Sequence, residues 1–250
     1  AMDLRKHYNI RTVGILRKYV RKIPDIVSDA QRVGLKYHDR ISKHISWAEA
    51  DKHAAYITKI LPNVVIAGSY RRKARQVGDI DVLTTGSLDA NVKKLTDKKY
   101  IVDVLSMGEH KFSGIVKLPN SSSFRRIDIV KTTPAEKPFA LLYFTGDFVQ
   151  NITMRQRAKS MKYMLSQHGL RNIKTGRYIS TIRSEKDIFD FLKIPYKTPA
   201  ERQHSGKQQL SFKKFSKKKA TATAKKKPTI SKKSTKKTTK KSPKKKKTTK

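Results

Sequence analysis

The chain has 250 residues and no cysteine, and its 59 Lys and Arg against 19 Asp and Glu give a formal net charge of +40. The lack of cysteine excludes a disulfide framework, a thiol nucleophile and a cysteine-based zinc site, and it fits a reducing compartment. No apolar run approaches the length of a membrane span or a signal-peptide core, so we expect an intracellular protein that is not secreted and has no membrane partner.

The positive charge is divided between two parts of very different composition. Residues 205–250 contain 20 lysines and no acidic residue, whereas residues 1–204 contain 39 basic and 19 acidic residues. A Lys-rich segment with few apolar residues cannot offset its chain entropy, so we predict a disordered basic tail over residues 204–250. Non-specific DNA attachment, nuclear import through Lys244–Lys247 and simple solubilisation all fit this composition. The basic body itself is typical of proteins that bind a phosphate backbone.

Three regions precede the tail. Residues 1–44 are predicted as short helices that form a truncated DNA-binding segment. Residues 45–133 are predicted as an α+β unit, with a helix capped by Ser46 in an S-x-x-E box that Glu49 completes. Strands are expected in this unit at residues 63–68, 79–84, 100–106, 111–118 and 124–131.

A further subdomain is expected over residues 134–203. Its apolar spacing predicts a helix over residues 147–167 that ends at His168-Gly169. Residues 170–182 are expected to form a hairpin around Lys174–Gly176. Ser184 is expected to cap the last helix, which has acidic residues in its first turn.

The most informative segment is Gly68-Ser69-Tyr70-Arg71-Arg72, which Gly78-Asp79-Ile80-Asp81 follows closely. Side chains alternate between the faces of a strand, so Asp79 and Asp81 are predicted on one face. Two adjacent carboxylates repel each other, and a hard divalent cation such as Mg²⁺ resolves that repulsion. The Gly-Ser turn and Arg72 suit a polyphosphate.

Asp128 is a candidate third carboxylate, because it lies between Ile127 and Ile129 in a predicted strand. Beside Asp79 and Asp81 in one sheet, it would complete a cage for two metal ions. Such a pair of ions holds the attacking and leaving oxygens of an in-line phosphoryl displacement.

These motifs resemble those of the family X DNA polymerases, the DNA polymerase beta family. The likeness extends to Tyr143-Phe144-Thr145-Gly146, to Asn151 and Arg155, and to the run from Ser184 to Phe191, and it covers about residues 9–203. The resemblance implies a nucleotidyltransferase-type palm, built from a mixed, mostly antiparallel sheet with helices, and a carboxy-terminal, thumb-like subdomain that selects the nucleotide.

The resemblance also implies roles for individual residues. Asp79, Asp81 and Asp128 would hold two Mg²⁺ ions, with Mn²⁺ as an alternative, and Arg126 would lie beside Asp128 and the primer end. Arg155 would contact the template strand. The incoming nucleotide would be bound by Ser69, Arg72, Gly78, Tyr143, Phe144, Gly146 and Asn151.

Departures from the family's pattern are also visible. Lys73 replaces a glycine that many relatives have after the paired arginines, and Phe148 stands where relatives often carry an aspartate against the incoming base. No helix-hairpin-helix or amino-terminal lyase domain is recognisable before Ile10, so the chain resembles the minimal viral members of the family.

The expected activity is template-dependent, gap-filling DNA synthesis in base excision repair. The expected partners are gapped or nicked duplex DNA and deoxynucleoside triphosphates, and the protein is expected to be a monomer in a nucleus, a viral replication compartment or a virion. Two alternatives remain at this stage. One is nucleotidyl transfer to RNA or another substrate, and the other is a non-enzymatic DNA-binding protein with a polymerase-like body.

Overall fold

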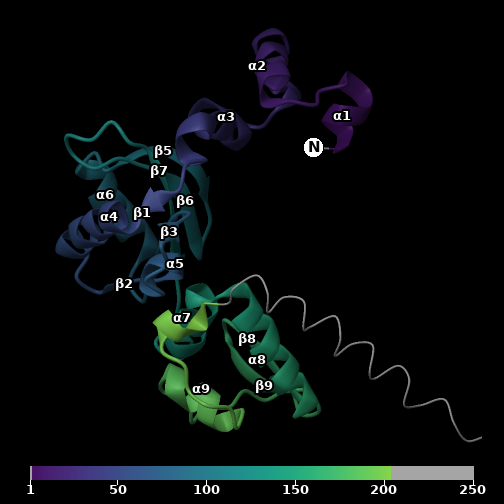
Figure 1. Ribbon diagram of the computed structural model, residues 1–250, viewed down its shortest axis with the longest axis vertical. Coiled ribbons are helices and arrows are strands. Elements are labelled where there is room, and N and C mark those ends of the chain that lie inside the picture. Colours follow the sequence, from purple (N-terminus) through teal and green to yellow (C-terminus); the bar gives the residue numbers. More distant parts are fainter. Residues whose placement is uncertain (1, 204–250) are drawn as a thin grey trace, which may run out of the picture. The chain divides into compact units, whose positions relative to one another are not determined.

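A five-stranded mixed sheet forms the centre of the computed structural model, which describes residues 2–203 (Figure 1). The spatial order is β2-β4-β7-β6-β5. The β4–β7 pair is parallel and the other three pairs are antiparallel. This arrangement confirms the predicted mixed, mostly antiparallel sheet. The strands are β2 (Val64–Ile66), β4 (Ile80–Thr84), β5 (Ile101–Met107), β6 (Lys111–Val116) and β7 (Arg125–Lys131).

Two helices, α4 (Trp47–Ile60) and α6 (Leu88–Asp97), cover one face of this sheet (Figure 1). The apolar side chains of β4 and β7 that point to this face, including Ile80 and Ile127, are buried in one core with Ile57 and Leu95. Because side chains alternate along a strand, the intervening residues of β4 and β7 point to the opposite face. The helices therefore leave that opposite face available for the acidic residues.

Ser46 caps α4 as expected, and its hydroxyl accepts a hydrogen bond from the backbone N–H of Glu49. The Glu49 carboxylate, however, binds the buried guanidinium of Arg125 on β7, with both N···O distances at 2.8 Å. The full capping box was therefore the wrong expectation, because a charged partner competes successfully with the backbone N–H for this carboxylate.

Several short elements precede the five-stranded sheet in the chain or lie between its first two strands. Short helices are present between residues 2 and 41, and Tyr37 of α3 (Asp29–Ile41) packs against Phe124 with ring centroids 5.0 Å apart. The elements before and around α4 are α1 (Met2–Tyr8), α2 (Val13–Lys22), η1 (Pro24–Ile26), α3 (Asp29–Ile41), β1 (Ile45–Ser46), α5 (Gly68–Arg71) and β3 (Gln76–Val77).

A second core lies in the carboxy-terminal subdomain, and it buries Leu142, Met154, Leu170 and Phe189. All described residues belong to one compact unit of the chain. This subdomain contains α7 (Lys137–Thr145), α8 (Phe148–Ser160), β8 (Tyr163–Ser166), β9 (Gly169–Asn172), α9 (Glu185–Phe191) and η2 (Pro199–Arg202).

The helix predicted over residues 147–167 is shorter than expected, since α8 ends at Ser160 and Lys162 has a left-handed φ of 67°. The following residues form β8, which pairs with β9 in an antiparallel hairpin. Leu165 is buried in the same core as the apolar side chains of α8. The spacing of Leu165 from those side chains therefore indicates that it is buried, and not that it belongs to the helix. The hairpin expected around Lys174–Gly176 is present: the backbone N–H groups of Asn172 and Ile179 donate to the backbone oxygens of Arg177 and Leu170, and Arg171 and Tyr178 form an isolated antiparallel bridge.

The last helix, α9, begins as predicted. Ser184 and Asp187 form a reciprocal capping box at its first turn. The Lys-rich tail expected over residues 204–250 lies outside the described residues. Within residues 2–203, no helix combines the length and the apolar character that a membrane crossing needs.

Candidate active site

Three carboxylates converge at the face of the sheet that α4 and α6 leave free. Asp81 of β4 and Asp128 of β7 are directly paired across the parallel strands, and Asp79 lies just before β4. Each carboxylate offers an oxygen, and these three oxygens lie within 4.8 Å of one another. The predicted convergence of the three acids is therefore present in the structure.

The charges in this cluster are unfavourable without a cation. Burial, followed by the negative charges of Asp79 and Asp128, raises the pKa of Asp81 to about 7. The neighbouring basic side chains supply partial compensation: Arg126 forms an ion pair with Asp79, and Lys111 forms one with Asp128. A set of three hard oxygen donors with unbalanced negative charge fits Mg²⁺ or Mn²⁺, and these three aspartates would hold it.

The short helix α5 approaches the cluster closely at its first residue. Gly68 has a φ of +60°, and a Cβ at this position would lie 2.0 Å from Oδ2 of Asp81. Any side chain here would displace the carboxylate, so glycine is needed for both its conformation and its size. The predicted Gly-Ser turn is thus the first turn of α5, in which half-buried Ser69 directly follows Gly68.

Arg72, which directly follows α5, contacts the last residue of α7. Its guanidinium donates a hydrogen bond to the backbone oxygen of Thr145. Burial lowers the pKa of Arg72, and the negative charges of Asp147 and Asp81 oppose that effect. Gly146 has a φ of +69°, and a Cβ there would approach Nη1 of Arg72 to 3.3 Å. Gly78, by contrast, is exposed, and a Cβ there would meet nothing within 4 Å.

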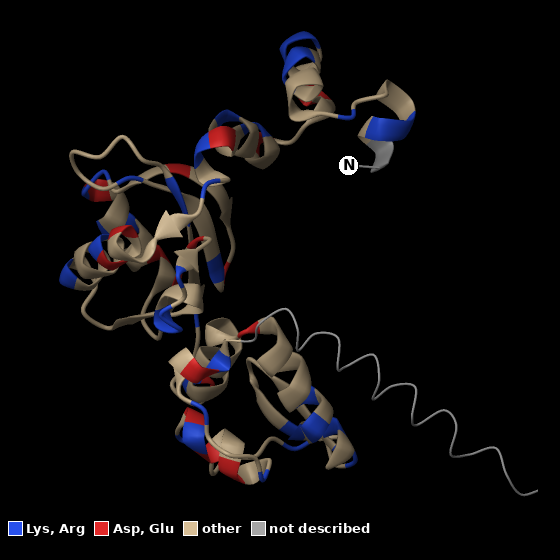
Figure 2. Ribbon diagram, viewed as in Figure 1, with Lys and Arg blue, Asp and Glu red and all other residues tan. Residues whose placement is uncertain are grey.

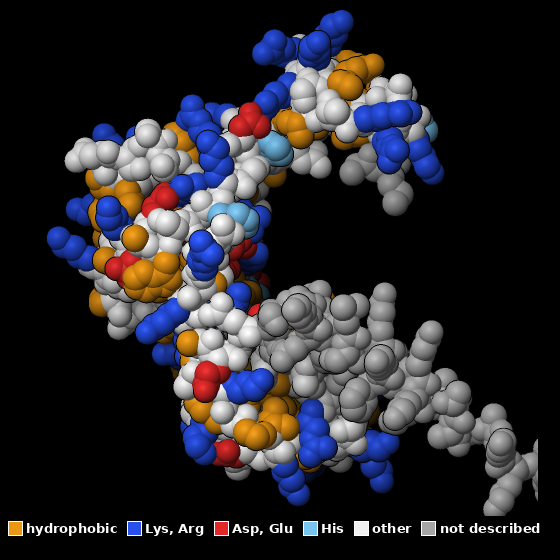
Figure 3. Space-filling model, in the orientation of Figure 1, with side chains coloured by type: hydrophobic (Ala, Val, Ile, Leu, Met, Phe, Trp, Pro, Cys, Tyr) orange, Lys and Arg blue, Asp and Glu red, His pale blue; other side chains and the backbone are white. Residues whose placement is uncertain are grey.

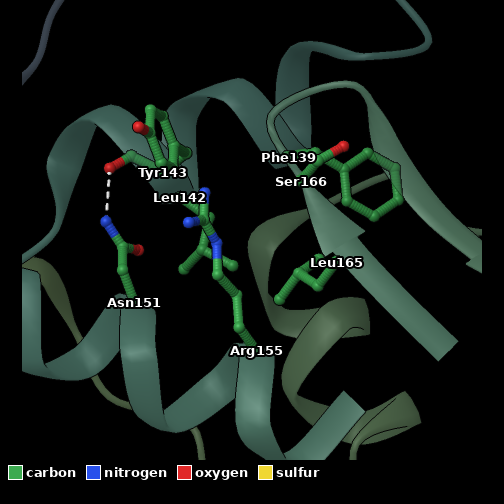
Figure 4. A pocket seen from close by; sticks show the side chains of 7 residues that line it. All are labelled: Phe139, Leu142, Tyr143, Asn151, Arg155, Leu165 and Ser166. Carbon is green, nitrogen blue, oxygen red and sulfur yellow. Dashed lines mark hydrogen bonds between the residues drawn. The ribbon is translucent and has the colours of Figure 1, made fainter. Parts of the chain in front are cut away.

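A second group of predicted residues meets in a pocket between α7, α8 and β8 (Figure 4). The side-chain amide of Asn151 donates to the backbone oxygen of Tyr143 at 2.8 Å. The guanidinium of Arg155 lies over the Tyr143 ring, with its carbon 4.8 Å from the ring centroid. Phe144 packs edge-to-face on Tyr143 at 5.1 Å. The pocket is lined by Phe139, Leu142, Tyr143, Asn151, Arg155, Leu165 and Ser166.

The structure therefore places the predicted residues in two groups. The three aspartates and Arg126 form one group, and Tyr143, Asn151 and Arg155 form the other. Arg72 is related to both groups, because it donates to the backbone oxygen of Thr145, two residues after Tyr143, and its charge interacts with that of Asp81. Phe148, a departure from the family's pattern, begins α8 and is 73% exposed.

Sequence reasoning missed two side chains of β6 that contact the cluster. Lys111 donates from Nζ to Oδ2 of Asp128 at 2.9 Å, and Ser113 donates from Oγ to Oδ1 at 2.6 Å. The signal was their i, i+2 spacing in a predicted strand, which places both on one face. The register with β7, which sequence does not provide, was needed to connect them with Asp128.

Sequence reasoning also missed a cluster of ion pairs and hydrogen bonds that links the two subdomains. Arg71 of α5 donates to both Thr145 Oγ1 and the Glu185 carboxylate, at 2.7 Å for each of the shortest contacts. Arg202, which is fully buried, donates to the same carboxylate at 2.6 Å.

Basic side chains extend beyond the two groups. Lys and Arg occur on strands and helices of both subdomains, with Asp and Glu among them (Figure 2). In the space-filling view, basic side chains occupy several areas of the visible face (Figure 3). Such a surface favours binding of a polyanion through its phosphates.

The paired strands, the three convergent carboxylates and the adjacent Gly-Ser helix form a nucleotidyltransferase-type palm. Comparison with known families agrees. The DNA polymerase beta palm family matches residues 44–134, and the DNA polymerase beta thumb family matches residues 140–203. Together these two matches span more than half of the chain, which therefore belongs to family X, the DNA polymerase beta-like family.

Individual relatives are moderately similar to this chain. DNA polymerase lambda of Rattus norvegicus is 31% identical over an alignment of 201 residues, and the match covers 69% of this chain and 35% of that protein. DNA polymerase/3'-5' exonuclease PolX of Bacillus subtilis is 29% identical over an alignment of 200 residues, and the match covers 78% of this chain and 33% of that protein. The chain thus spans about a third of the length of these relatives.

Two solved structures resemble the fold more completely. The ternary P/T complex of Leishmania infantum polymerase beta has a TM-score of 0.72 and 29% identity, and the match covers 81% of this chain and 92% of that chain. The ternary gap complex of the same protein has a TM-score of 0.72 and 28% identity, with 81% and 84% covered.

Proposed function

We propose that this chain is a DNA-directed DNA polymerase that fills short gaps in duplex DNA during base excision repair. The observation that carries this proposal is the convergence of Asp79, Asp81 and Asp128 within 4.8 Å on one face of the sheet. The similarity to a polymerase beta whose solved complex is described as a ternary gap complex supports gapped DNA as the substrate.

In the proposed reaction, the primer 3′-oxygen attacks the α-phosphate of a deoxynucleoside triphosphate and pyrophosphate leaves. Two Mg²⁺ ions, or Mn²⁺ in their place, would supply electrostatic stabilisation of the attacking and leaving oxygens. Asp79, Asp81 and Asp128 would hold these ions, and Asp128 would also assist removal of the proton from the primer hydroxyl. Arg126 lies beside Asp128 at the primer end.

The nucleotide is bound by residues from both subdomains. Ser69, Arg72 and Gly78 bind the β- and γ-phosphates, for which a guanidinium and backbone N–H groups are suitable donors. Tyr143, Phe144 and Gly146 pack against the sugar. Asn151 contacts the base from the minor-groove side, and Arg155 contacts the template strand.

In this structure the Asn151 amide donates to the backbone oxygen of Tyr143, and the Arg72 guanidinium donates to the backbone oxygen of Thr145. A side-chain amide has two N–H donors and a guanidinium has five, so both groups can keep these bonds while another N–H binds the nucleotide.

The proposed setting is a monomer acting in a nucleus, a viral replication compartment or a virion. Because the DNA is held mainly by basic side chains, its binding should weaken steeply with salt. The Lys-rich residues 205–250 would contribute either to this attachment or to nuclear import.

The test is primer extension on a one-nucleotide-gapped duplex with all four deoxynucleotides, in parallel with an RNA primer that lacks a template. The wild-type chain should extend the gapped DNA, and Asp128→Ala should lose that extension. Near wild-type extension by Asp128→Ala would remove the two-metal proposal. Extension of the RNA alone would replace the DNA polymerase by an RNA nucleotidyltransferase, and no extension of either would leave a DNA-binding protein.

A further inference from the structure

The strand next to Asp128 supplies a hydrogen bond to each oxygen of its carboxylate. Ser113 of β6 is the direct cross-strand partner of Asp128 of β7, and its hydroxyl donates to Oδ1 at 2.6 Å. Lys111, two residues earlier and on the same face of β6, donates from Nζ to Oδ2 at 2.9 Å. Asp128 is therefore held between a neutral donor and a charged donor.

These two donors have different physical properties. Ser113 is half-buried and has a single side-chain torsion before its hydroxyl, so it loses little conformational entropy when it holds the carboxylate. The Lys111 side chain is 51% exposed and ends a flexible four-carbon stem. A long exposed side chain defines the orientation of its partner poorly, because holding it in place costs entropy and solvent weakens its attraction.

The donors also differ in how they respond to a metal ion. The ammonium of Lys111 neutralises Asp128, which is the task that a divalent cation would take over, and the two positive charges would repel each other. The hydroxyl of Ser113 is neutral and can remain on one carboxylate oxygen while the other faces the ion. Ligating carboxylates in metalloproteins are commonly held by such a second hydrogen bond.

We propose that Ser113 is the positioning residue for Asp128: its hydroxyl holds the carboxylate in the orientation that shares a divalent ion with Asp79 and Asp81. This inference deepens the proposed function and rests on it for the reaction, although metal binding by the three aspartates can be measured without catalysis. Lys111 is a counter-ion of Asp128 in this structure and is not needed for that orientation.

The experiment compares Ser113→Ala with Ser113→Thr, which retains a hydroxyl. Ser106→Ala is the matched control, because exposed Ser106 lies on β5, one strand further from Asp128 in the same sheet. Mn²⁺ binding is measured on the full chain without DNA or nucleotide, from the loss of the electron paramagnetic resonance signal of the free ion. Single-turnover gap filling is measured on the same proteins over a range of Mg²⁺ concentrations.

Loss of a hydrogen bond to a ligating group typically costs about 10- to 100-fold in metal affinity or activity. We expect Ser113→Ala to weaken Mn²⁺ binding by about 10-fold and to require more Mg²⁺ for half-maximal rate, with an unchanged apparent affinity for the nucleotide. Ser113→Thr should retain most of the wild-type Mn²⁺ affinity and should need a near wild-type Mg²⁺ concentration for half-maximal rate. Ser106→Ala should match the wild type in both measurements.

Two results would overturn the role of Ser113. The first is Mn²⁺ affinity and Mg²⁺ dependence in Ser113→Ala that equal those of the wild type. The second is an equal loss in Ser113→Ala and Ser106→Ala together with a lower melting temperature, which would indicate a general effect on the sheet. Failure of the proposed polymerase would look different: the wild type would incorporate no nucleotide, whereas the Mn²⁺ measurements would still separate the variants.

Discussion

Asp81 and Asp128 lie directly opposite each other on the parallel strands β4 and β7, with their side chains on the same face of the sheet. Both side chains are largely shielded from solvent, and 16% of the Asp128 side chain is exposed. A pairing of this kind concentrates negative charge where solvent screens it poorly. The site is therefore built at a cost in stability that a bound cation would offset.

This relationship leads to a prediction for Asp81→Asn. The variant should lose nucleotide incorporation by about 10³-fold, because the amide cannot supply the negative charge that holds a cation. In a chelating buffer at pH 8 the same variant should melt about 2–4 °C higher than the wild type, if removing the repulsion is worth roughly 1 kcal/mol. Differential scanning calorimetry and single-turnover incorporation measure the two effects.

Asp89→Asn is the matched control for this variant, because Asp89 is exposed in the first turn of α6. It should neither raise the melting temperature nor reduce incorporation. An unchanged or lower melting temperature in Asp81→Asn would show that the buried carboxylates do not destabilise the metal-free protein.

The sequence was sufficient to predict the three carboxylates, because strand alternation assigns each of them to the face opposite its apolar neighbours. Ile80 and Ile127 are buried in the core as that alternation requires. The order of the motifs resembles that of family X, and this resemblance predicted that the three acids lie in one sheet. What the sequence did not reveal was the register that sets Asp81 against Asp128, since pairing between distant strands depends on the whole sheet.

Contacts that depend on this register were missed for the same reason. Ser113 and Lys111 have an ordinary spacing for a strand, and only the pairing of β6 with β7 brings them to Asp128. The boundary of α8 was missed because Met161 and Leu165 continue the helical spacing while the backbone changes direction at Lys162. Apolar spacing reports which side chains are buried, and a short strand can bury the same positions as a helical turn.

A second prediction concerns the buried ion-pair cluster of Glu185. Its carboxylate binds Arg71 at 2.7 Å and fully buried Arg202 at 2.6 Å. Glu185→Gln would leave two guanidinium groups without their negative partner, and breaking such a buried pair typically costs about 3–5 kcal/mol. We therefore expect a large decrease in the free energy of unfolding, measured by urea denaturation.

The neighbouring pair of Asp190 and Lys186 provides the control. It is on the same helix and has an N···O distance of 2.6 Å, but both side chains are more than half exposed. Asp190→Asn should change the urea midpoint much less than Glu185→Gln does. Similar midpoints for the two variants would mean that the buried cluster contributes no more than a surface pair.

A third prediction concerns pH and His53, which is 1% exposed and whose Nδ1 lies 2.7 Å from the Tyr100 hydroxyl oxygen. Burial lowers the pKa of His53 from 6.5 to about 4, although the charge of Glu49 opposes this effect. Between pH 6.5 and pH 4 the unfolded chain takes up a proton at this residue and the folded protein does not. The free energy of unfolding should therefore fall as the pH is lowered through this range.

One pKa unit corresponds to about 1.4 kcal/mol, so the contribution of His53 to this loss approaches roughly 3 kcal/mol near pH 4. His53→Gln should be less stable at neutral pH but should show a shallower decline from pH 6.5 to pH 4. Exposed His44 gives the control, and His44→Gln should retain the wild-type slope. Parallel slopes for wild type and His53→Gln in urea titrations would show that His53 is protonated in the folded protein.

The last prediction concerns the choice between deoxynucleotides and ribonucleotides at Tyr143. This half-buried ring is covered by the guanidinium of Arg155 on one side and contacted edge-to-face by Phe144. In the proposed complex the Tyr143 segment packs against the sugar, so an added 2′-hydroxyl would meet it. Tyr143→Ala should therefore lower the preference for deoxynucleotides by about 10-fold or more, because a steric contact of this size is worth 1–3 kcal/mol.

Tyr143→Phe retains the ring and the surface for Arg155, so it should keep the wild-type preference. The measurement is the ratio of kcat/KM for a deoxynucleoside triphosphate to that for the matching ribonucleoside triphosphate on one gapped duplex. A wild-type preference in both Tyr143→Ala and Tyr143→Phe would place sugar selection elsewhere. A preference lost equally in both variants would assign it to the phenolic hydroxyl, because the ring alone would then be insufficient.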